Sequence, residues 1–191
     1  MSLATPAPSL ILHLLKTNTL IRPFAPTDSD IECLAQHADN PLIAQFMRNA
    51  FPHPYTRDAA IKWINFTLSQ NPICHFAICD ANTNTIIGAI GLKGRDDVQY
   101  RSMEVGYWLG QEFWGRGIGS EAVGEFVKWV FGHEGFGHLV RIDAEVFDGN
   151  EGSKRVLEKV GFGFEGRRRK AVEKNGLVLD TFVYALLREE L

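Results

Sequence analysis

Cysteine is scarce in this 191-residue sequence, which contains three. An odd number without a CxxC pair excludes a disulfide framework of the kind that staples small secreted domains, and it favours a reducing, cytoplasmic setting. We therefore expect Cys33, Cys74 and Cys79 to be small buried apolar residues. Histidine, cysteine and acidic residues nowhere have the spacing of metal ligands, so we expect no metal site.

Long apolar runs and a large net charge are missing as well. No run reaches the roughly 18 residues that a membrane-spanning helix needs, and the N-terminus lacks the basic leader and cleavage site of a signal peptide. The formal net charge of −3 gives no support to a nucleic-acid partner. These absences favour a cytoplasmic protein with neither a membrane nor a nucleic acid among its partners.

The composition that remains is that of an ordinary globular domain, with 45% hydrophobic and 23% charged residues. We expect a flexible tail over residues 1–9 and one domain over 10–191. Helical spacing and capping signals predict helices over 28–38, 41–46, 57–69, 118–130 and 153–160. Alternation and turn residues predict strands over 10–23, 73–79, 85–92, 98–109, 139–146, 164–172 and 177–187. The pattern predicts an α/β fold with a mixed sheet of about seven strands.

Three glycines alternate in WGRGIGS, residues 114–120, between a strand-like segment and a helix-like one. Glycine loses more conformational entropy on folding than other residues, so we expect these glycines to be present because something must approach the backbone closely. Backbone N–H groups and a helix N-terminus converge at such a loop, where a phosphate could approach closely. The dinucleotide pattern GxGxxG fails because Ser120 stands at its third glycine, and no Walker GK[ST] run exists. The loop alone predicts an anion site, with a glycine-rich turn that binds nothing as the alternative.

Two longer segments give the loop a context. EVGYWLGQEFWGRGIGSEAV (104–123) and NEGSKRVLEKVGF (150–162) lie in the order and spacing of the GNAT acetyltransferase superfamily, and they resemble its RimJ/RimL-like subgroup. PYTRDAAIKWI (54–64) and DTFVYALLREE (180–190) agree with the same resemblance. It implies a single-domain GNAT-like fold with a mostly antiparallel sheet flanked by helices. It also implies an acetyl-CoA-dependent N-acetyltransferase that moves an acetyl group directly to a primary amine.

The resemblance assigns the cofactor, acetyl-CoA, to three segments. Backbone groups of Tyr107, Trp108 and Leu109 are implied to contact the pantetheine, together with Asn150. The pyrophosphate is implied to rest on the loop residues Trp114, Gly115, Arg116, Gly117, Ile118, Gly119 and Ser120. The broader superfamily has Arg or Gln where this chain has Trp114, so one side-chain contact is lost, while Arg116 could add positive charge.

Acetyl transfer from a thioester to an amine requires that the amine lose a proton and that the leaving thiolate be protonated or held. We predict Glu104 as the general base, acting directly or through water, because alternation places it on one strand face with Gly106 and Trp108. An apolar pocket is expected around it, and a purely structural carboxylate is the alternative. The resemblance makes Ser153 the candidate proton donor, whereas helix capping alone would also explain Asn150 and Ser153.

The acceptor amine is expected near the early loop, where Phe46, Arg48, Phe51 and Tyr55 border its slot by resemblance to the family. Asp180 is a further candidate for substrate binding, with packing inside the C-terminal hairpin as the alternative. The acceptor is either a protein or peptide N-terminus or a small-molecule amine. Other functions are also open at this point: an acyl-CoA-binding regulatory module without turnover, and a nucleotide-dependent α/β protein. The oligomeric state, monomer or homodimer, is also open.

Overall fold

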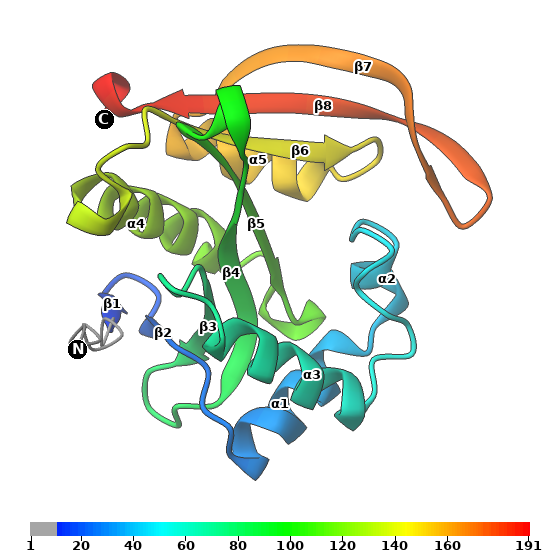
Figure 1. Cartoon of the computed structure of the whole chain (residues 1–191). Coiled ribbons are helices and arrows are strands. Elements are labelled where there is room, and N and C mark those ends of the chain that lie inside the picture. Colours follow the sequence, from blue (N-terminus) through cyan, green and yellow to red (C-terminus); the bar gives the residue numbers. More distant parts are fainter. Residues whose placement is uncertain (1–10) are drawn as a thin grey trace.

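The computed structural model describes residues 11–191 (Figure 1), so the predicted tail at 1–9 lies outside the described residues. Its strands are β1 (Leu12–Leu14), β2 (Thr19–Arg22), β3 (His75–Asp80), β4 (Ile86–Gly94), β5 (Ser102–Leu109), β6 (Arg141–Phe147), β7 (Gly163–Lys174) and β8 (Leu177–Leu187). Within the described residues they form one eight-stranded sheet in the order β1-β2-β3-β4-β5-β6-β8-β7. Every neighbouring pair is antiparallel except β5 and β6. The predicted mixed, mostly antiparallel α/β fold is confirmed.

The additional strand comes from the N-terminal segment, which was expected to form one strand over 10–23. The chain instead reverses at Asn18, whose φ of 51° lies in the left-handed region that asparagine tolerates better than most residues. β1 and β2 therefore pair with each other, with Leu12 opposite Ile21. The start of the predicted strand over 98–109 also differs, because Asp97–Gln99 forms a short 3-10 turn before β5.

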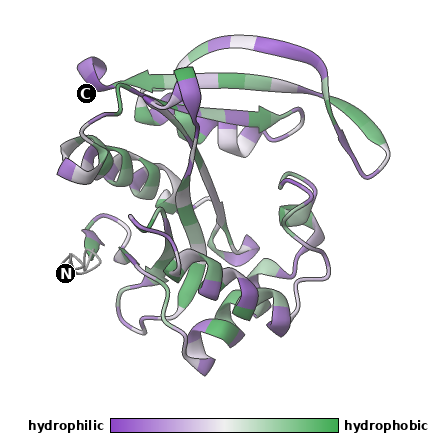
Figure 2. Ribbon diagram, in the orientation of Figure 1, coloured by the Kyte–Doolittle hydropathy of each residue, from purple (hydrophilic) through white to green (hydrophobic). Residues whose placement is uncertain are grey.

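Helices cover both faces of the sheet: α1 (Asp28–Ala38), α2 (Pro41–Ala44), α3 (Arg57–Leu68), α4 (Ile118–Gly132) and α5 (Glu151–Val160). One face packs Phe76 of the sheet against Phe126 of α4 and Leu157 of α5 in a single core cluster. The opposite face packs Trp108 against Leu34 of α1 and Ile64 of α3. Figure 2 shows that α4 is largely hydrophobic, as a helix covering the sheet should be, and that β7 is largely hydrophilic.

The start of α4 differs from the starts of its neighbours. Thr27, Asn40, Thr56 and Asn150 cap α1, α2, α3 and α5 with side-chain oxygens that accept backbone N–H bonds. The N-cap of α4 is Gly117, which has a left-handed backbone and no side chain that could accept a hydrogen bond. The first N–H groups of α4 are therefore left for another acceptor.

β5 and β6 lie side by side for only part of their length. Their parallel pairing ends where Glu104 lies opposite Asp143. β5 stays paired with β4 as far as Leu109, while β6 stays paired with β8 as far as Phe147. Each strand thus follows its own half of the sheet, and the two halves diverge beyond Glu104 (Figure 1).

The last two strands form a long hairpin that extends beyond β6 (Figure 1). Its turn lies at Asn175 and Gly176, with φ of 51° and 78°, as the Asn-Gly pair predicts. Near the tip, Lys174 donates a hydrogen bond of 3.2 Å to Asn49 in the loop that follows α2. The hairpin is thereby tied to the loop that was expected to border the acceptor.

Candidate functional site

The divergence of β5 and β6 opens a cavity of about 1440 Å³. Its walls come from β4, β5 and β6, from the loop before α4, from the first turns of α5 and from the segment between α2 and α3. The predicted site residues that line it are Phe46, Arg48, Phe51, Tyr55, Glu104, Tyr107, Trp108, Leu109, Trp114, Gly115, Gly117, Ile118, Gly119, Ser120, Asn150 and Ser153. The structure therefore brings nearly all of the predicted residues into one cavity.

Two predicted residues lie elsewhere. Asp180 accepts a hydrogen bond of 2.7 Å from the backbone N–H of Lys170 and forms an ion pair with Arg167, all within the β7–β8 hairpin. This is the hairpin packing that was the alternative to a substrate role. The Arg116 guanidinium lies over the Phe113 ring, 5.4 Å from its centroid, outside the lining of the cavity.

The three glycines of the loop differ in backbone conformation and in the space around them. Gly115 and Gly117 have φ of 75° and 79°, and a Cβ at either position would meet nothing within 4 Å. Their requirement is therefore conformational. A Cβ on Gly119 would lie 3.4 Å from Cγ2 of Val156 in α5, an ordinary van der Waals contact, so neither space nor backbone conformation requires this glycine.

The backbone N–H groups of residues 115–120 indicate an anion-binding site. Among residues 11–191 they have no hydrogen-bond acceptor, and they surround the uncapped start of α4. Unpaired N–H groups and the positive end of the helix dipole together favour a phosphate. Trp114 was predicted to contact the pyrophosphate as well, but its backbone N–H already donates to the carbonyl of Gln111 at 3.2 Å. Its indole N–H donates to the carbonyl of Leu109 at 2.8 Å, which fixes the loop against the end of β5.

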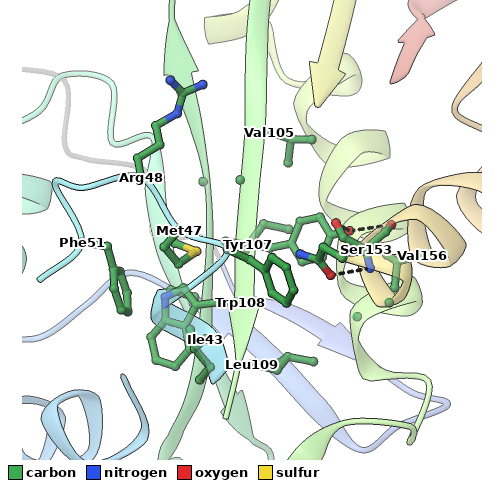
Figure 3. Close-up of a pocket in the computed structure, with 18 of the residues that line it drawn as sticks. Ile43, Met47, Arg48, Phe51, Val105, Tyr107, Trp108, Leu109, Ser153 and Val156 are labelled. Carbon is green, nitrogen blue, oxygen red and sulfur yellow. Dashed lines mark hydrogen bonds between the residues drawn. The ribbon is translucent and has the colours of Figure 1, made fainter. Parts of the chain in front are cut away.

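A hydroxyl pair lies on the α5 side of the cavity. The Tyr107 hydroxyl is 2.8 Å from Ser153 Oγ and 3.3 Å from the Ser153 carbonyl oxygen (Figure 3). The Ser153 backbone N–H donates to Asn150 Oδ1 at 3.1 Å, which confirms the predicted cap of α5. Burial raises the pKa of Tyr107 above its usual value, so this phenol stays protonated. Only a backbone contact was predicted for Tyr107. The alternation of side chains along β5 could have indicated that its side chain lies on the face opposite Glu104, toward α5.

Glu104 lies on the opposite face of β5, as predicted, but its surroundings are not apolar. Both of its carboxylate oxygens accept hydrogen bonds from Arg48 Nη2, at 2.6 and 2.9 Å. The same nitrogen is 3.3 Å from Oε2 of Glu145, a β6 residue that the sequence analysis missed. Desolvation lowers the pKa of Arg48, but the hydrogen bond to Glu104 and the charges of both glutamates outweigh it, so the net shift is upward.

Aromatic side chains line the part of the cavity where the acceptor was expected. The Phe51 ring lies 4.9 Å from the Tyr55 ring and 6.0 Å from Trp108, centroid to centroid. Figure 3 shows Phe51 and Met47 beside Trp108, while Tyr107 points the other way from β5. Burial raises the pKa of Tyr55 to about 12, so its hydroxyl is neutral near pH 7. This part of the cavity therefore has a largely apolar wall.

His75 also lines the cavity, although no role was predicted for it. Its ring lies 5.0 Å from Trp63 and 6.1 Å from Phe66, and burial lowers its pKa to about 4. This side chain is therefore neutral in the folded protein near pH 7.

The lowered pKa of His75 predicts a loss of stability in acid. Between its usual value of 6.5 and about 4, the unfolded chain binds a proton that the folded chain does not, so the free energy of unfolding falls as the pH falls. We expect His75 to account for about 2 kcal/mol of loss between pH 7 and pH 5. Urea unfolding at both pH values should show a correspondingly smaller loss in His75→Phe. An identical pH dependence in both proteins would contradict this assignment.

Among residues 11–191, no helix is long and apolar enough to cross a membrane. The same range holds no group of three or more His, Cys, Asp or Glu side chains arranged to bind a metal ion.

Comparison with known proteins identifies the family. A model described as the acetyltransferase (GNAT) domain matches residues 18–163. The probable N-acetyltransferase YjcK of Bacillus subtilis (strain 168) is 34% identical over 181 residues, which are 93% of this chain and 98% of that protein. The chain therefore belongs to the GNAT acetyltransferase family, and it is an N-acetyltransferase of that family, as its motifs predict. The regulatory module without turnover receives no support from these relatives.

Solved structures share the fold. Mycobacterium smegmatis RimJ in complex with a CoA-disulfide has a TM-score of 0.76 at 22% identity, covering 91% of this chain and 83% of that one. RimL, a ribosomal L7/L12 alpha-N-protein acetyltransferase in complex with coenzyme A, also has a TM-score of 0.76, at 19% identity, covering 92% of this chain and 97% of that one. The fold is thus shared with RimJ and RimL, in keeping with the subgroup that the motifs resemble.

Proposed function

We propose that the cavity binds acetyl-CoA in the gap between β5 and β6 and that the protein transfers the acetyl group directly to a primary amine. The observation that carries the proposal is the set of N–H groups at residues 115–120, which have no hydrogen-bond acceptor among residues 11–191 and belong to a loop that lines the same cavity. Gly115 and Gly117 leave the approach to these N–H groups free of side chains. The complexes of RimJ and RimL with CoA species support the same assignment.

Each part of the cofactor has residues that suit it. The pyrophosphate is assigned to the N–H groups of 115–120, and the pantetheine to the edge of β5 from Tyr107 to Leu109, which β6 no longer pairs with. Asn150 Nδ2 remains available to the pantetheine, since Asn150 Oδ1 caps α5. Arg155 and Lys159 of α5 also line the cavity and add positive charge for phosphates. Arg116 is left out of the proposed contacts because it does not line the cavity.

Bound acetyl-CoA supplies the acetyl group as a reactive thioester. Glu104 accepts a proton from the acceptor ammonium, which leaves the nitrogen lone pair free to form the new amide bond. The leaving sulfur would take its proton from Ser153 Oγ, and Ser153 would regain one from Tyr107, whose hydroxyl lies 2.8 Å away and is kept protonated at rest by burial. The nitrogen would lose its second proton as the amide forms, and that proton would pass through solvent to restore the Tyr107 phenol. Glu104 would release the first proton to solvent.

The hydroxyl pair gives a testable expectation. If Tyr107 supplies the proton through Ser153, Tyr107→Phe and Ser153→Ala should each reduce kcat by about tenfold or more. The double variant should be little worse than either single variant, because both act in one proton path. Affinity for acetyl-CoA should stay within about twofold, which separates this effect from lost packing. Fully multiplicative losses in the double variant would show that the two hydroxyls act independently.

The acceptor is proposed to be either a protein or peptide N-terminus or a small-molecule amine. Purified protein should be incubated with acetyl-CoA and a panel of N-terminally free tripeptides, primary alkylamines and diamines, with free thiol and product mass followed together. We expect thiol release that depends on the amine and equals the acetylated product. Acetyl-CoA binding with no release for any amine would instead support the regulatory module.

We further propose that residues 10–191 form one acetyltransferase domain that acts in the cytoplasm. Cys33, Cys74 and Cys79 are free thiols, which supports a reducing setting. The proposed partners are the cofactor and the amine acceptor, and both the monomer and the homodimer fit the proposal.

A further inference from the structure

A single nitrogen lies between the carboxylates of Glu104 and Glu145. Arg48 Nη2 is within hydrogen-bond distance of three oxygens, two on Glu104 at 2.6 and 2.9 Å and one on Glu145 at 3.3 Å. The two glutamates come from the diverging strands β5 and β6, and both line the large cavity. The two carboxylates thus approach each other where β5 and β6 begin to diverge, at the closed end of the gap in which the thioester is proposed to lie.

The two carboxylates provide acceptors for a primary ammonium. The two oxygens of Glu104 lie too close together to accept separate N–H groups from one nitrogen, so they share one, and Oε2 of Glu145 can accept a second. A primary ammonium carries three N–H groups, so at the position of Arg48 Nη2 it could donate one to each carboxylate.

Glu145 is held in place independently of Arg48. Its other oxygen, Oε1, accepts a hydrogen bond of 2.8 Å from the hydroxyl of the fully buried Thr181, and it also contacts Arg168 at 3.3 Å. The side chains of both glutamates are 16% exposed, whereas that of Arg48 is 50% exposed and lies on the loop after α2. Arg48 can therefore move into solvent while the Glu145 carboxylate remains held by Thr181.

We infer that Glu145 is a second acceptor-binding residue, that it and Glu104 together bind the acceptor as an ammonium ion, and that Arg48 occupies this position until the acceptor enters. The inference rests on the proposed function and narrows its acceptors to amines that arrive protonated. The entering ammonium replaces the Arg48 nitrogen on both carboxylates. One proton then passes from the ammonium to Glu104, and the nitrogen keeps the electron pair that forms the amide bond.

The two partners of this ion pair should have opposite effects on the acceptor. With the panel amine that the wild type turns over fastest, Glu145→Gln should raise the KM for the amine by about tenfold or more. Arg48→Ala should lower that KM, because the amine no longer competes with the arginine. The KM for acetyl-CoA should change by less than about twofold in both variants.

The matched control is Glu165→Gln, which should change neither KM. It removes a carboxylate that is hydrogen-bonded to Arg141 and does not line the large cavity. A purely structural ion pair would move the amine KM in the same direction in both variants, and that result would overturn the inference.

A binding measurement tests the same position without turnover. The CoA-loaded Arg48→Ala protein, labelled with ¹³C in its glutamate carboxylates, should be titrated with methylammonium chloride, with tetramethylammonium chloride as a control that has no N–H donor. We expect methylammonium alone to shift the signals of Glu104 and Glu145, and neither salt to shift that of Glu165. The absence of a selective shift would overturn the inference, even if the panel shows acetyl transfer. A selective shift in a protein that acetylates no amine would support the ammonium site and refute the proposed function.

Discussion

Gly117→Asp is expected to lose at least about a hundredfold in affinity for acetyl-CoA relative to Gly117→Asn. Both replacements tolerate the left-handed backbone at this position, where φ is 79°. A Cβ there meets nothing within 4 Å, so either side chain can be accommodated by the folded protein. The pair differs in one negative charge, which Asp would place beside the N–H groups assigned to the pyrophosphate. Equilibrium titration with acetyl-CoA measures the difference.

The two variants control for one another. Gly117→Asn reports the cost of adding a side chain, and its thermal unfolding should match that of Gly117→Asp within a few degrees. The salt dependence gives a second check, since the difference in affinity should shrink as ionic strength rises. Equal affinity in both variants would show that the phosphates bind away from the start of α4.

Glu104→Gln is expected to reduce kcat by about 10² to 10⁴ near neutral pH. Glutamine keeps the shape of the side chain and can still contact Arg48, but it cannot accept a proton. The loss should diminish as the pH rises toward the pKa of the acceptor amine, because a deprotonated amine needs no base. The KM for acetyl-CoA should stay within about twofold. Steady-state rates across the pH range, measured with both substrates varied, test these expectations.

Glu165→Gln again provides the comparison, because it removes a carboxylate that is bonded to an arginine outside the large cavity. Its rates should follow those of the wild type at every pH. If the pH profile of Glu104→Gln has the same shape as that of the wild type, Glu104 is not the general base. Glu104 would then be a structural carboxylate that binds Arg48.

Local features of the fold could be predicted closely from the sequence. The helix over 28–38 was predicted with its observed limits, because Thr27 is a capping residue followed by a regular apolar stripe. The turn at Asn175-Gly176 was likewise encoded by two adjacent residues that favour positive φ. The split of the first predicted strand at Asn18 was missed, since one asparagine is a weak turn signal.

Side-chain contacts across the sheet could not be predicted in the same way. Arg48 donates hydrogen bonds to Glu104, 56 positions away in the sequence, and to Glu145, 97 positions away. No local sequence pattern predicts contacts between residues so far apart. The predicted apolar surroundings of Glu104 were wrong for this reason. Motifs did identify one side of the cavity, because nearly half of its lining residues come from two continuous segments, 104–120 and 149–159. The acceptor side is assembled from separate elements, so its detail depends on the tertiary structure.

The central claim is that acetyl-CoA lies in the gap between β5 and β6 with its pyrophosphate at the start of α4. A crystal structure of the protein with acetyl-CoA tests it most directly. We predict pyrophosphate oxygens within hydrogen-bond distance of the N–H groups of residues 115–120, and the thioester on the edge of β5 between Glu104 and Ser153. Phosphates bound elsewhere, with those N–H groups still unpaired, would contradict the account.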